Sequence, residues 1–116
     1  MCIKSNFRKI NILGTYYTIE ELSRTEDKIL NTCDGYCDKT YKRIVIVTRP
    51  EDCELDNFEE YRKKILRHEI IHAFLFESGL QENFKHDTWG HDEIMVDWIA
   101  IQFPKLLDVF KQLNII

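Results

Sequence analysis

The chain has 116 residues, the size of one ordinary domain, and we expect residues 1–116 to form a single domain with one core. Hydrophobic residues make up 44% and charged residues 31% of it, which argues against wholesale disorder. The formal net charge is only −4, and the one basic run is flanked by acidic residues, so we expect a solvated helix face and no nucleic-acid partner. That run contains Arg62, Lys63, Lys64 and Arg67.

The expected compartment is the cytoplasm, without membrane contact. No apolar run approaches the roughly 18 residues that cross a bilayer, and the stretch from Met1 to Arg8 lacks the apolar core of a secretory signal. In a reducing compartment cysteines are more often free thiols than disulfides. The spacing of Cys33 and Cys37 does not fit a structural zinc site. The sequence assigns no role to any of its cysteines, which are Cys2, Cys33, Cys37 and Cys53.

The N-terminal part of the chain carries patterns typical of strands. Lys9–Leu13 and Thr15–Ile19 are rich in β-branched and aromatic residues, with Gly14 between them. They predict either one bent strand or two. Residues 20–32 fit a short helix and a polar loop equally well.

The next strands are predicted on either side of position 40. Asp34-Gly35 predicts a turn, followed by a short strand at Tyr36–Cys37. Tyr41–Thr48 carries the strongest strand pattern in the chain, and Pro50 ends it. Its four consecutive apolar residues, Ile44–Val47, predict a strand that is covered on both faces.

The C-terminal part carries helical patterns. Asp56, three residues before Glu59, fits a capping box and predicts a helix over Asn57–Ser78. Gly79 supplies the expected stop at its C-terminus. From Ile65 to Phe76 this helix is apolar on nearly all sides, which predicts a buried central helix.

A loop and a further helical region complete the predicted order of elements. The loop spans Gly79 to about Trp89, and a second, mostly apolar helix runs from about Gly90 to Phe103. Pro104 interrupts it, so we expect Lys105–Leu113 to form a short helix of its own. The predicted fold class is α+β, with a small, mainly antiparallel sheet packed on these helices.

Three ionisable residues, His68, Glu69 and His72, stand inside the predicted buried helix. Residues four apart lie about 40° apart around a helix and one turn along it, so both imidazoles can reach one metal ion. Glu69 is rotated by roughly 100° from His68. It can instead hold a water at the metal and take its proton, because zinc lowers the pKa of water toward neutrality. This is the mechanics of the His-Glu-x-x-His motif of metalloproteases.

The motif has an alternative interpretation. A five-residue pattern arises by chance in many proteins, and two helix histidines can simply be hydrogen-bonded core residues. The apolar surroundings favour the metal site, because three ionisable groups in a buried helix would be costly without a partner. A bound zinc ion, the expected cofactor, would offset that cost.

A catalytic zinc site needs a third protein ligand and one open position. We predict Glu93 as this ligand, because Asp97 follows it on the same helix face and can orient a ligating histidine from behind. His91 is the main competitor, but it is rotated by roughly 200° from Glu93 on a helix and has Met95 at the equivalent position. The downstream candidates considered are His86, Asp87, His91, Asp92, Glu93 and Asp97.

These residues carry a resemblance to a known family. His68-Glu69-x-x-His72 followed by Glu93-x-x-x-Asp97 resembles the gluzincin pattern of zinc metallopeptidases, in which the second motif supplies the third ligand and an aspartate behind a histidine. The whole chain is similar to small stand-alone zincin-like peptidases of phage and bacterial genomes. The resemblance implies a minimal zincin-like fold in which a strand beside the active helix binds extended peptide along its edge. Ile44–Val47 is the expected strand.

The chain departs from the thermolysin-like members of that family. It leaves no room for a second lobe, and no residue clearly matches the histidine and tyrosine that stabilise the oxyanion there. Possible substitutes are Tyr16, Tyr17, Tyr41, His86 and His91.

The expected function is zinc-dependent hydrolysis of a peptide or protein substrate, with Glu69 as the catalytic base. The alternative is a zinc-stabilised protein-binding module without turnover. The sequence names neither the substrate nor the oligomeric state.

Overall fold

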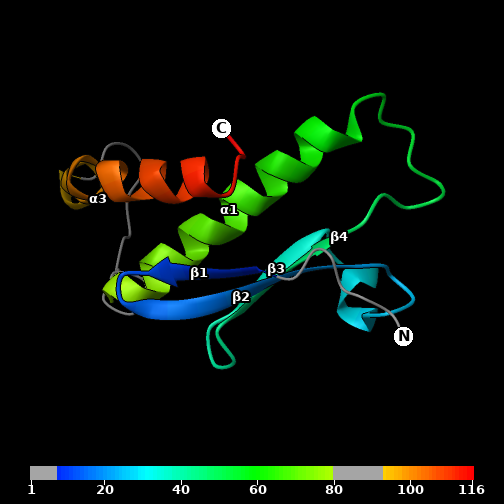
Figure 1. Cartoon of the computed structure of the whole chain (residues 1–116), viewed down its shortest axis with the longest axis horizontal. Helices are drawn as coiled ribbons and strands as arrows, with labels where there is room; N and C mark the ends of the chain where they lie inside the picture. The colour runs from blue at the N-terminus through cyan, green and yellow to red at the C-terminus, as the bar shows by residue number, and fades with distance from the viewer. Residues whose placement is uncertain (1–7, 80–92) are drawn as a thin grey trace.

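The computed structural model describes residues 8–79 and 93–116, which form a four-stranded sheet with two long helices packed on it (Figure 1). The strands and helices are β1 (Arg8–Ile12), β2 (Thr15–Leu22), β3 (Gly35–Asp38), β4 (Arg43–Val47), α1 (Phe58–Ser78) and α3 (Glu93–Gln112), with a 3₁₀ turn η1 (Lys28–Asn31). The order in the sheet is β1-β2-β4-β3. β1 and β2 are antiparallel, as are β3 and β4, whereas β2 and β4 are parallel. The predicted α+β class with a mainly antiparallel sheet is confirmed.

The first two strands form a hairpin. Leu13 and Gly14 connect them with φ angles of 52° and 98°, which suits a tight two-residue turn between antiparallel strands. The Asn11 Oδ1 atom accepts a hydrogen bond from the Gly14 amide at 2.7 Å and fixes the turn. Of the two alternatives for this region, two strands are therefore correct. In the ambiguous segment 20–32, β2 continues to Leu22 and η1 follows.

Strand β4 is covered on both faces, as its apolar run predicts, since Ile44–Val47 are at most 1% exposed. Ile44 and Ile46 face the main core, which includes residues of both helices. Val45 and Val47 belong to a second, smaller cluster that also contains Leu22, Leu30 and Phe58.

The edge of the sheet beside α1 is β3, and the prediction that Ile44–Val47 offers a free edge is wrong. β4 pairs with β2 on one side and β3 on the other, so both of its edges are used. The turn predicted at Asp34-Gly35 is reduced to a bend at Asp34, because Gly35 already begins β3, which contains the predicted strand Tyr36–Cys37. Gly35 allows β3 to pack closely against α1, because a Cβ atom at this position would lie only 2.7 Å from the Ile65 Cγ2 atom.

Helix α1 begins and ends close to the predicted residues, but its cap lies one position later than predicted. Asn57, and not Asp56, is the N-cap, and its Oδ1 atom accepts a hydrogen bond from the Glu60 amide at 3.2 Å. The capping box of Asp56 and Glu59 is therefore wrong by one residue. Gly79 ends the helix in the left-handed conformation, with φ of 81°.

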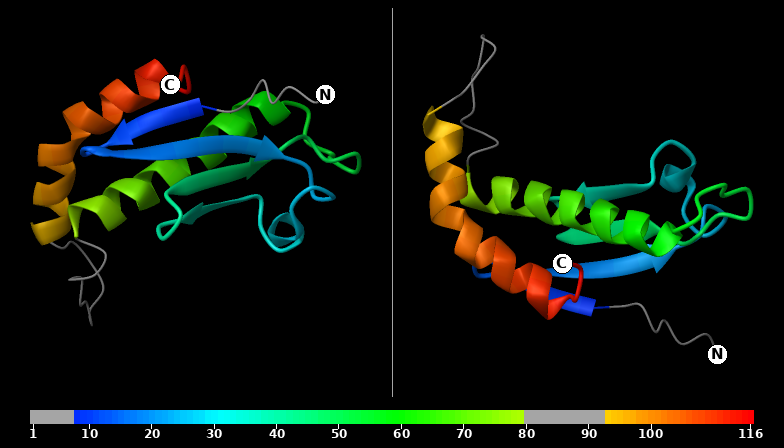
Figure 2. Two further views of the ribbon diagram at one scale, coloured as in Figure 1. Left: turned by 60° about the horizontal axis from the view of Figure 1, so that its bottom comes forward. Right: turned by 90° about the horizontal axis from the view of Figure 1, so that it is seen from above.

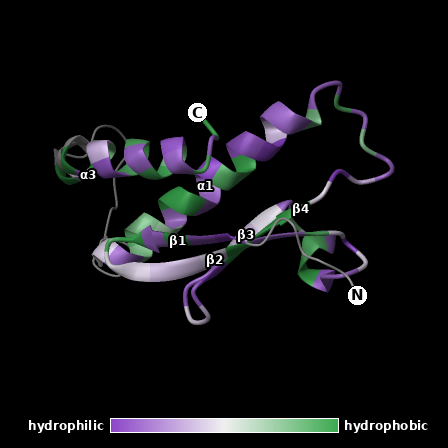
Figure 3. Cartoon of the chain, in the orientation of Figure 1, coloured by the Kyte–Doolittle hydropathy of each residue, from purple (hydrophilic) through white to green (hydrophobic). Residues whose placement is uncertain are grey.

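Only one side of α1 is buried, which contradicts the prediction of a helix buried all round. Ile70 and Phe74 are at most 1% exposed, whereas Ile71, rotated by about 100° from Ile70, is 39% exposed. Hydrophilic and hydrophobic stretches alternate along the ribbon of this helix (Figure 3). The apolar run therefore led to a prediction of more burial than the structure shows, because Ile71 is apolar but exposed to solvent.

Helix α3 passes through Pro104 without a break, so the predicted division into two helices is wrong. Pro104 is exposed, and the helix curves around the core (Figure 2). A proline inside a helix costs about 3 kcal/mol. Burial of Leu106, Val109 and Phe110 beyond it offsets this cost, at about 1.5–3 kcal/mol for each large side chain.

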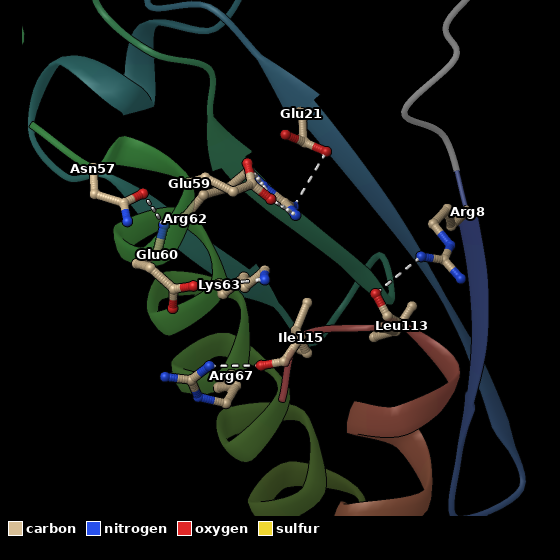
Figure 4. Close-up of polar contacts among 10 residues, drawn as sticks. All are labelled: Arg8, Glu21, Asn57, Glu59, Glu60, Arg62, Lys63, Arg67, Leu113 and Ile115. Atoms are coloured by element: carbon tan, nitrogen blue, oxygen red, sulfur yellow. Dashed lines mark hydrogen bonds and ion pairs between the residues drawn. The ribbon is translucent and has the colours of Figure 1, made fainter.

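Polar contacts from two arginines hold the C-terminus against the sheet and α1 (Figure 4). Arg8 Nη2 donates to the Gln112 carbonyl at 3.0 Å, and Arg67 Nη1 donates to the Ile115 carbonyl at 2.6 Å. Ile115 itself is fully buried. Neither described helix is long and apolar enough to cross a membrane.

Candidate functional site

His68 and His72 lie on the same side of α1, one turn apart. Their Nε2 atoms are 3.2 Å apart, and their ring planes are inclined by 66°. The helix around them is unbroken from Phe58 to Ser78 and is capped at both ends, so this spacing is fixed by regular helix geometry. The structure therefore brings together the two histidines that the motif predicts as ligands.

The separation of the two nitrogens fits joint coordination of zinc. Two imidazole nitrogens at about 2.0–2.1 Å from a tetrahedral zinc ion lie about 3.3 Å apart. The same separation allows a hydrogen bond between two neutral rings, one donating and one accepting. His68 is exposed and His72 is half-buried, so an ion can reach both rings from solvent.

The surroundings of His72 favour its neutral form. Burial lowers its pKa, and the neighbouring charge of His68 lowers it further. Its ring stacks on Phe76, with centroids 6.1 Å apart and an interplanar angle of 21°. The Lys39 ammonium lies 5.3 Å from the centroid of the same Phe76 ring. A neutral imidazole is the form that coordinates metals.

Glu69 is buried, but it lines the same pocket as the exposed His68. It is 6% exposed and is the only buried charged residue in the described part of the chain. Burial raises its pKa, and the charge of His68 opposes this shift only in part. We expected all three ionisable residues of the motif to be buried, and this is wrong for His68 and His72. Of the three, only Glu69 is fully buried, whereas His72 is half-buried and His68 is exposed.

Strand β3 lies along α1 and brings Cys37 close to Glu69. Gly35 packs against Ile65, and alternate residues of a strand face the same side, so Cys37 faces α1 one turn further on. Burial raises the pKa of the Cys37 thiol to about 12, and the charge of Glu69 adds to the shift. The thiol is therefore protonated at neutral pH. Cys33, Cys37 and Cys53 are free thiols, and Cys2 lies outside the described residues.

A pocket of about 240 Å³ lies beside the motif, between the start of β3 and the preceding turns of α1. Asp34 and Gly35 line one side of it. Tyr61 and Lys64 line the other side and lead to His68 and Glu69. The sequence argument missed these pocket residues, although the spacing of Lys64 and His68, four residues apart, already placed them on one helix face.

The structure locates the backbone of Glu93, the predicted third ligand, but does not describe its side chain. Glu93 and Asp97 lie in the first turns of α3, but their side chains are outside the described part of the structure. Trp98 Nε1 donates a hydrogen bond to Ser78 Oγ at 3.2 Å, so this end of α3 meets the C-terminal end of α1. Within the described residues, no group of three or more histidine, cysteine or acidic side chains forms a metal site. The other candidates, His86, Asp87, His91 and Asp92, lie outside the described residues, as does most of the predicted loop.

The described tyrosines named as substitutes for an oxyanion-stabilising group differ in burial and in their contacts. Tyr17 is fully buried, and its hydroxyl donates to Glu77 Oε2 at 2.7 Å. Tyr16 and Tyr41 are 64% and 74% exposed. Burial and the hydrogen bond to Glu77 raise the pKa of Tyr17 far above its ordinary value.

Comparison with known proteins assigns no family. No family model, curated protein or solved structure matches the chain. The resemblance to gluzincins therefore stays a prediction, and any function must be argued from the motif and from the geometry around it.

Proposed function

We propose that the protein is a zinc-dependent peptidase. The observation that carries this proposal is the arrangement on α1, where two histidine nitrogens lie 3.2 Å apart and a buried glutamate follows the first histidine. Two rings at this distance present a pair of metal donors to solvent. A buried carboxylate beside them is costly to the fold, and a catalytic role explains why such a group is kept.

Each residue of the proposed site has a separate role. His68, His72 and Glu93 would hold the zinc ion, and Asp97 would orient one of the histidines. When bound, zinc supplies a Lewis acid and lowers the pKa of water toward neutrality. Glu69 accepts a proton from water at its carboxylate. Its raised pKa brings it closer to the operating pH, which suits a general base.

The substrate would lie along β3. The outer edge of β3 pairs with no other described strand, and β3 packs against the helix that carries the motif. An extended peptide can add to such an edge through main-chain hydrogen bonds. A peptide in this position would run alongside the face of α1 on which His68 is exposed.

The test combines metal content with a single substitution. We expect one zinc ion per chain by elemental analysis of the purified protein, both in the wild type and in Glu69→Gln. Turnover of a cleaved peptide should fall by about 10²–10⁴-fold in Glu69→Gln, the usual contribution of a general base. Glu60→Gln, an exposed position earlier on α1, is the matched control and should retain activity.

Two results would overturn the proposal. Absence of zinc under every loading condition would remove the metal site. Unchanged turnover in Glu69→Gln would remove Glu69 from the chemistry.

A zinc-stabilised binding module without turnover is the second candidate. One observation favours it: within the described residues, the one buried tyrosine offered as an oxyanion donor, Tyr17, is already bonded to Glu77. Such a module would bind unfolded proteins or peptides from a library only when loaded with zinc. A chelator-treated sample and a cleavage assay on the bound peptides separate the two functions.

A further inference from the structure

The basic run on α1 contains one residue that differs from the others. Arg62, Lys63 and Arg67 are each held by a described acidic residue or carbonyl group (Figure 4). Lys64 makes no hydrogen bond or ion pair with any described residue. A solvated helix face explains the three partnered residues, and Lys64 needs a separate account. The partners of the other three are Glu21 and Glu59 for Arg62, Glu60 for Lys63 and the Ile115 carbonyl for Arg67.

Lys64 lines the pocket of about 240 Å³ that also contains His68 and Glu69. It stands four residues before His68, so both side chains lie on the same face of α1, about 6 Å apart along the axis. The pocket is therefore continuous with the proposed metal site and carries an unpaired positive charge at its rim.

Asp34, one of the two acidic residues that line the pocket, does not neutralise Lys64. Asp34 accepts a hydrogen bond from Arg24 Nη2 at 2.9 Å through its Oδ1 atom, and its Oδ2 atom accepts one from the Tyr61 hydroxyl. Both carboxylate oxygens of Asp34 thus have partners. Glu69, the other acidic lining residue, is only 6% exposed, whereas Lys64 is exposed. Among the exposed charged side chains that line the pocket, Lys64 is therefore the one without a described partner.

We propose that this pocket is a carboxylate-binding subsite of the proposed peptidase, with Lys64 as its specificity-determining residue; the inference rests on the proposed function. The volume is below the roughly 300–1,000 Å³ of pockets that take a whole small molecule. It suits one substrate side chain or a chain end. A carboxylate reaching Lys64 from a peptide on β3 lies within one helix turn of His68.

The carboxylate has two possible sources with the same chemistry. It is either a glutamate or aspartate side chain next to the scissile bond, or the C-terminal carboxylate of the peptide. The first predicts cleavage beside internal acidic residues, and the second predicts removal of residues from the C-terminus.

A binding experiment on zinc-loaded Glu69→Gln tests the subsite independently of turnover. The probes are fluorescein-labelled hexa-alanine peptides with an amidated C-terminus and a glutamate at one position at a time. A matched glutamine series gives the neutral reference. Hexa-alanine with a free C-terminus tests the second source. Dissociation constants are measured by fluorescence anisotropy at low salt and at about 1 M salt, where exposed charges are screened.

We expect glutamate at one position, or the free C-terminus, to bind about 2- to 5-fold more tightly than its neutral counterpart at low salt, the range of an exposed ion pair. Lys64→Met should abolish the preference and Lys64→Glu should reverse it. Lys63→Met is the matched control and should retain it, because Lys63 pairs with Glu60 at 3.7 Å and does not line the pocket. Lys64 is exposed, so its variants should fold normally.

The outcomes separate the two proposals. An equal preference in Glu69→Gln with and without Lys64→Met overturns the subsite, even if the protein with Glu69 intact cleaves peptides. A Lys64-dependent preference in Glu69→Gln supports the subsite. If the zinc-loaded protein with Glu69 intact then cleaves none of the bound probes, the same result overturns the proposed peptidase activity and leaves the subsite standing.

Discussion

Glu69 and Glu77 lie on the same helix, roughly two turns apart, in opposite surroundings. Glu69 is 6% exposed, and no described side chain donates a hydrogen bond to it, so burial raises its pKa. The Glu77 side chain is 13% exposed and accepts hydrogen bonds from Tyr17 and Lys42. Burial alone would raise the pKa of Glu77 as well, but these hydrogen bonds outweigh it and lower the pKa.

The two glutamates need different explanations. The surroundings of Glu77 explain it as a structural residue, because it joins the end of α1 to the buried hydroxyl of Tyr17 on β2. The surroundings of Glu69 give no structural benefit that compensates for its burial. A residue that costs stability and lies beside an exposed and a half-buried histidine is better explained by function. The predictions below test this distinction.

The largest effect is expected at the histidine pair. His72→Ala should weaken zinc binding by more than about 100-fold, because loss of a direct ligand exceeds the 10–100-fold effect of removing the residues behind ligands. Ile71→Ala is the matched control: the neighbouring side chain is 39% exposed and should leave affinity unchanged. Zinc titration against a competing chelator measures both. Normal affinity in His72→Ala would place the metal elsewhere or nowhere.

The same titration decides the third ligand. We expect Glu93→Ala to lose affinity by a comparable factor and His91→Ala to bind normally. The reverse result would exclude the gluzincin arrangement while leaving the two histidines of α1 as ligands.

At the structural end of the comparison, Glu77→Ala should destabilise the fold by about 1–3 kcal/mol, because it leaves the buried Tyr17 hydroxyl without an acceptor. Tyr17→Phe in the same background should recover part of this loss, since both partners are then removed. Glu60→Ala breaks the exposed pair with Lys63 and should change stability by less than about 1 kcal/mol. Urea unfolding measures all of these. A Glu77→Ala protein as stable as Glu60→Ala would contradict the structural role.

Much of the fold followed from local sequence patterns. The β-branched runs predict extended chain at β1, β2 and β4, although they left open whether β1 and β2 form one bent strand or two. Gly79 predicts the end of α1. These features depend on neighbouring residues in the chain. The position of β4 inside the sheet could not be predicted in this way. Strand order is set by long-range pairing, and the apolar run of Ile44–Val47 indicates only that the strand is covered.

The incorrect predictions for the two helices also have their cause in tertiary packing. Pro104 should end a helix by its local chemistry, but the burial of residues beyond it outweighs that cost. The motif residues were predicted by their spacing alone, and the structure brings His68 and His72 together. Their exposure was predicted incorrectly, because an apolar run does not say which of its faces meets solvent. The pocket at Lys64 depends on the approach of β3, which no helical pattern contains.

The smallest effect expected is the pH dependence of stability in zinc-free protein, where the two glutamates should act in opposite directions. The folded-state pKa of Glu69 is raised above its ordinary value of 4.5, so the folded protein binds a proton more tightly than the unfolded chain does. Stability from this residue is therefore full below pH 4.5 and is lost as the pH rises through the folded pKa. Glu69→Gln removes this loss, and its advantage over the wild type should grow from acid to neutral pH.

Glu77 should show the opposite sign. Its folded-state pKa is lowered, so its contribution is full above 4.5 and is lost as the pH falls through the folded pKa. Glu77→Gln should therefore differ most from the wild type at neutral pH, as the less stable protein, and least in acid. Urea unfolding of chelator-treated wild type, Glu69→Gln and Glu77→Gln between pH 3 and 8 measures both trends. If Glu69→Gln were destabilised at neutral pH like Glu77→Gln, Glu69 would be a structural carboxylate and the argument from its burial to a catalytic role would fail.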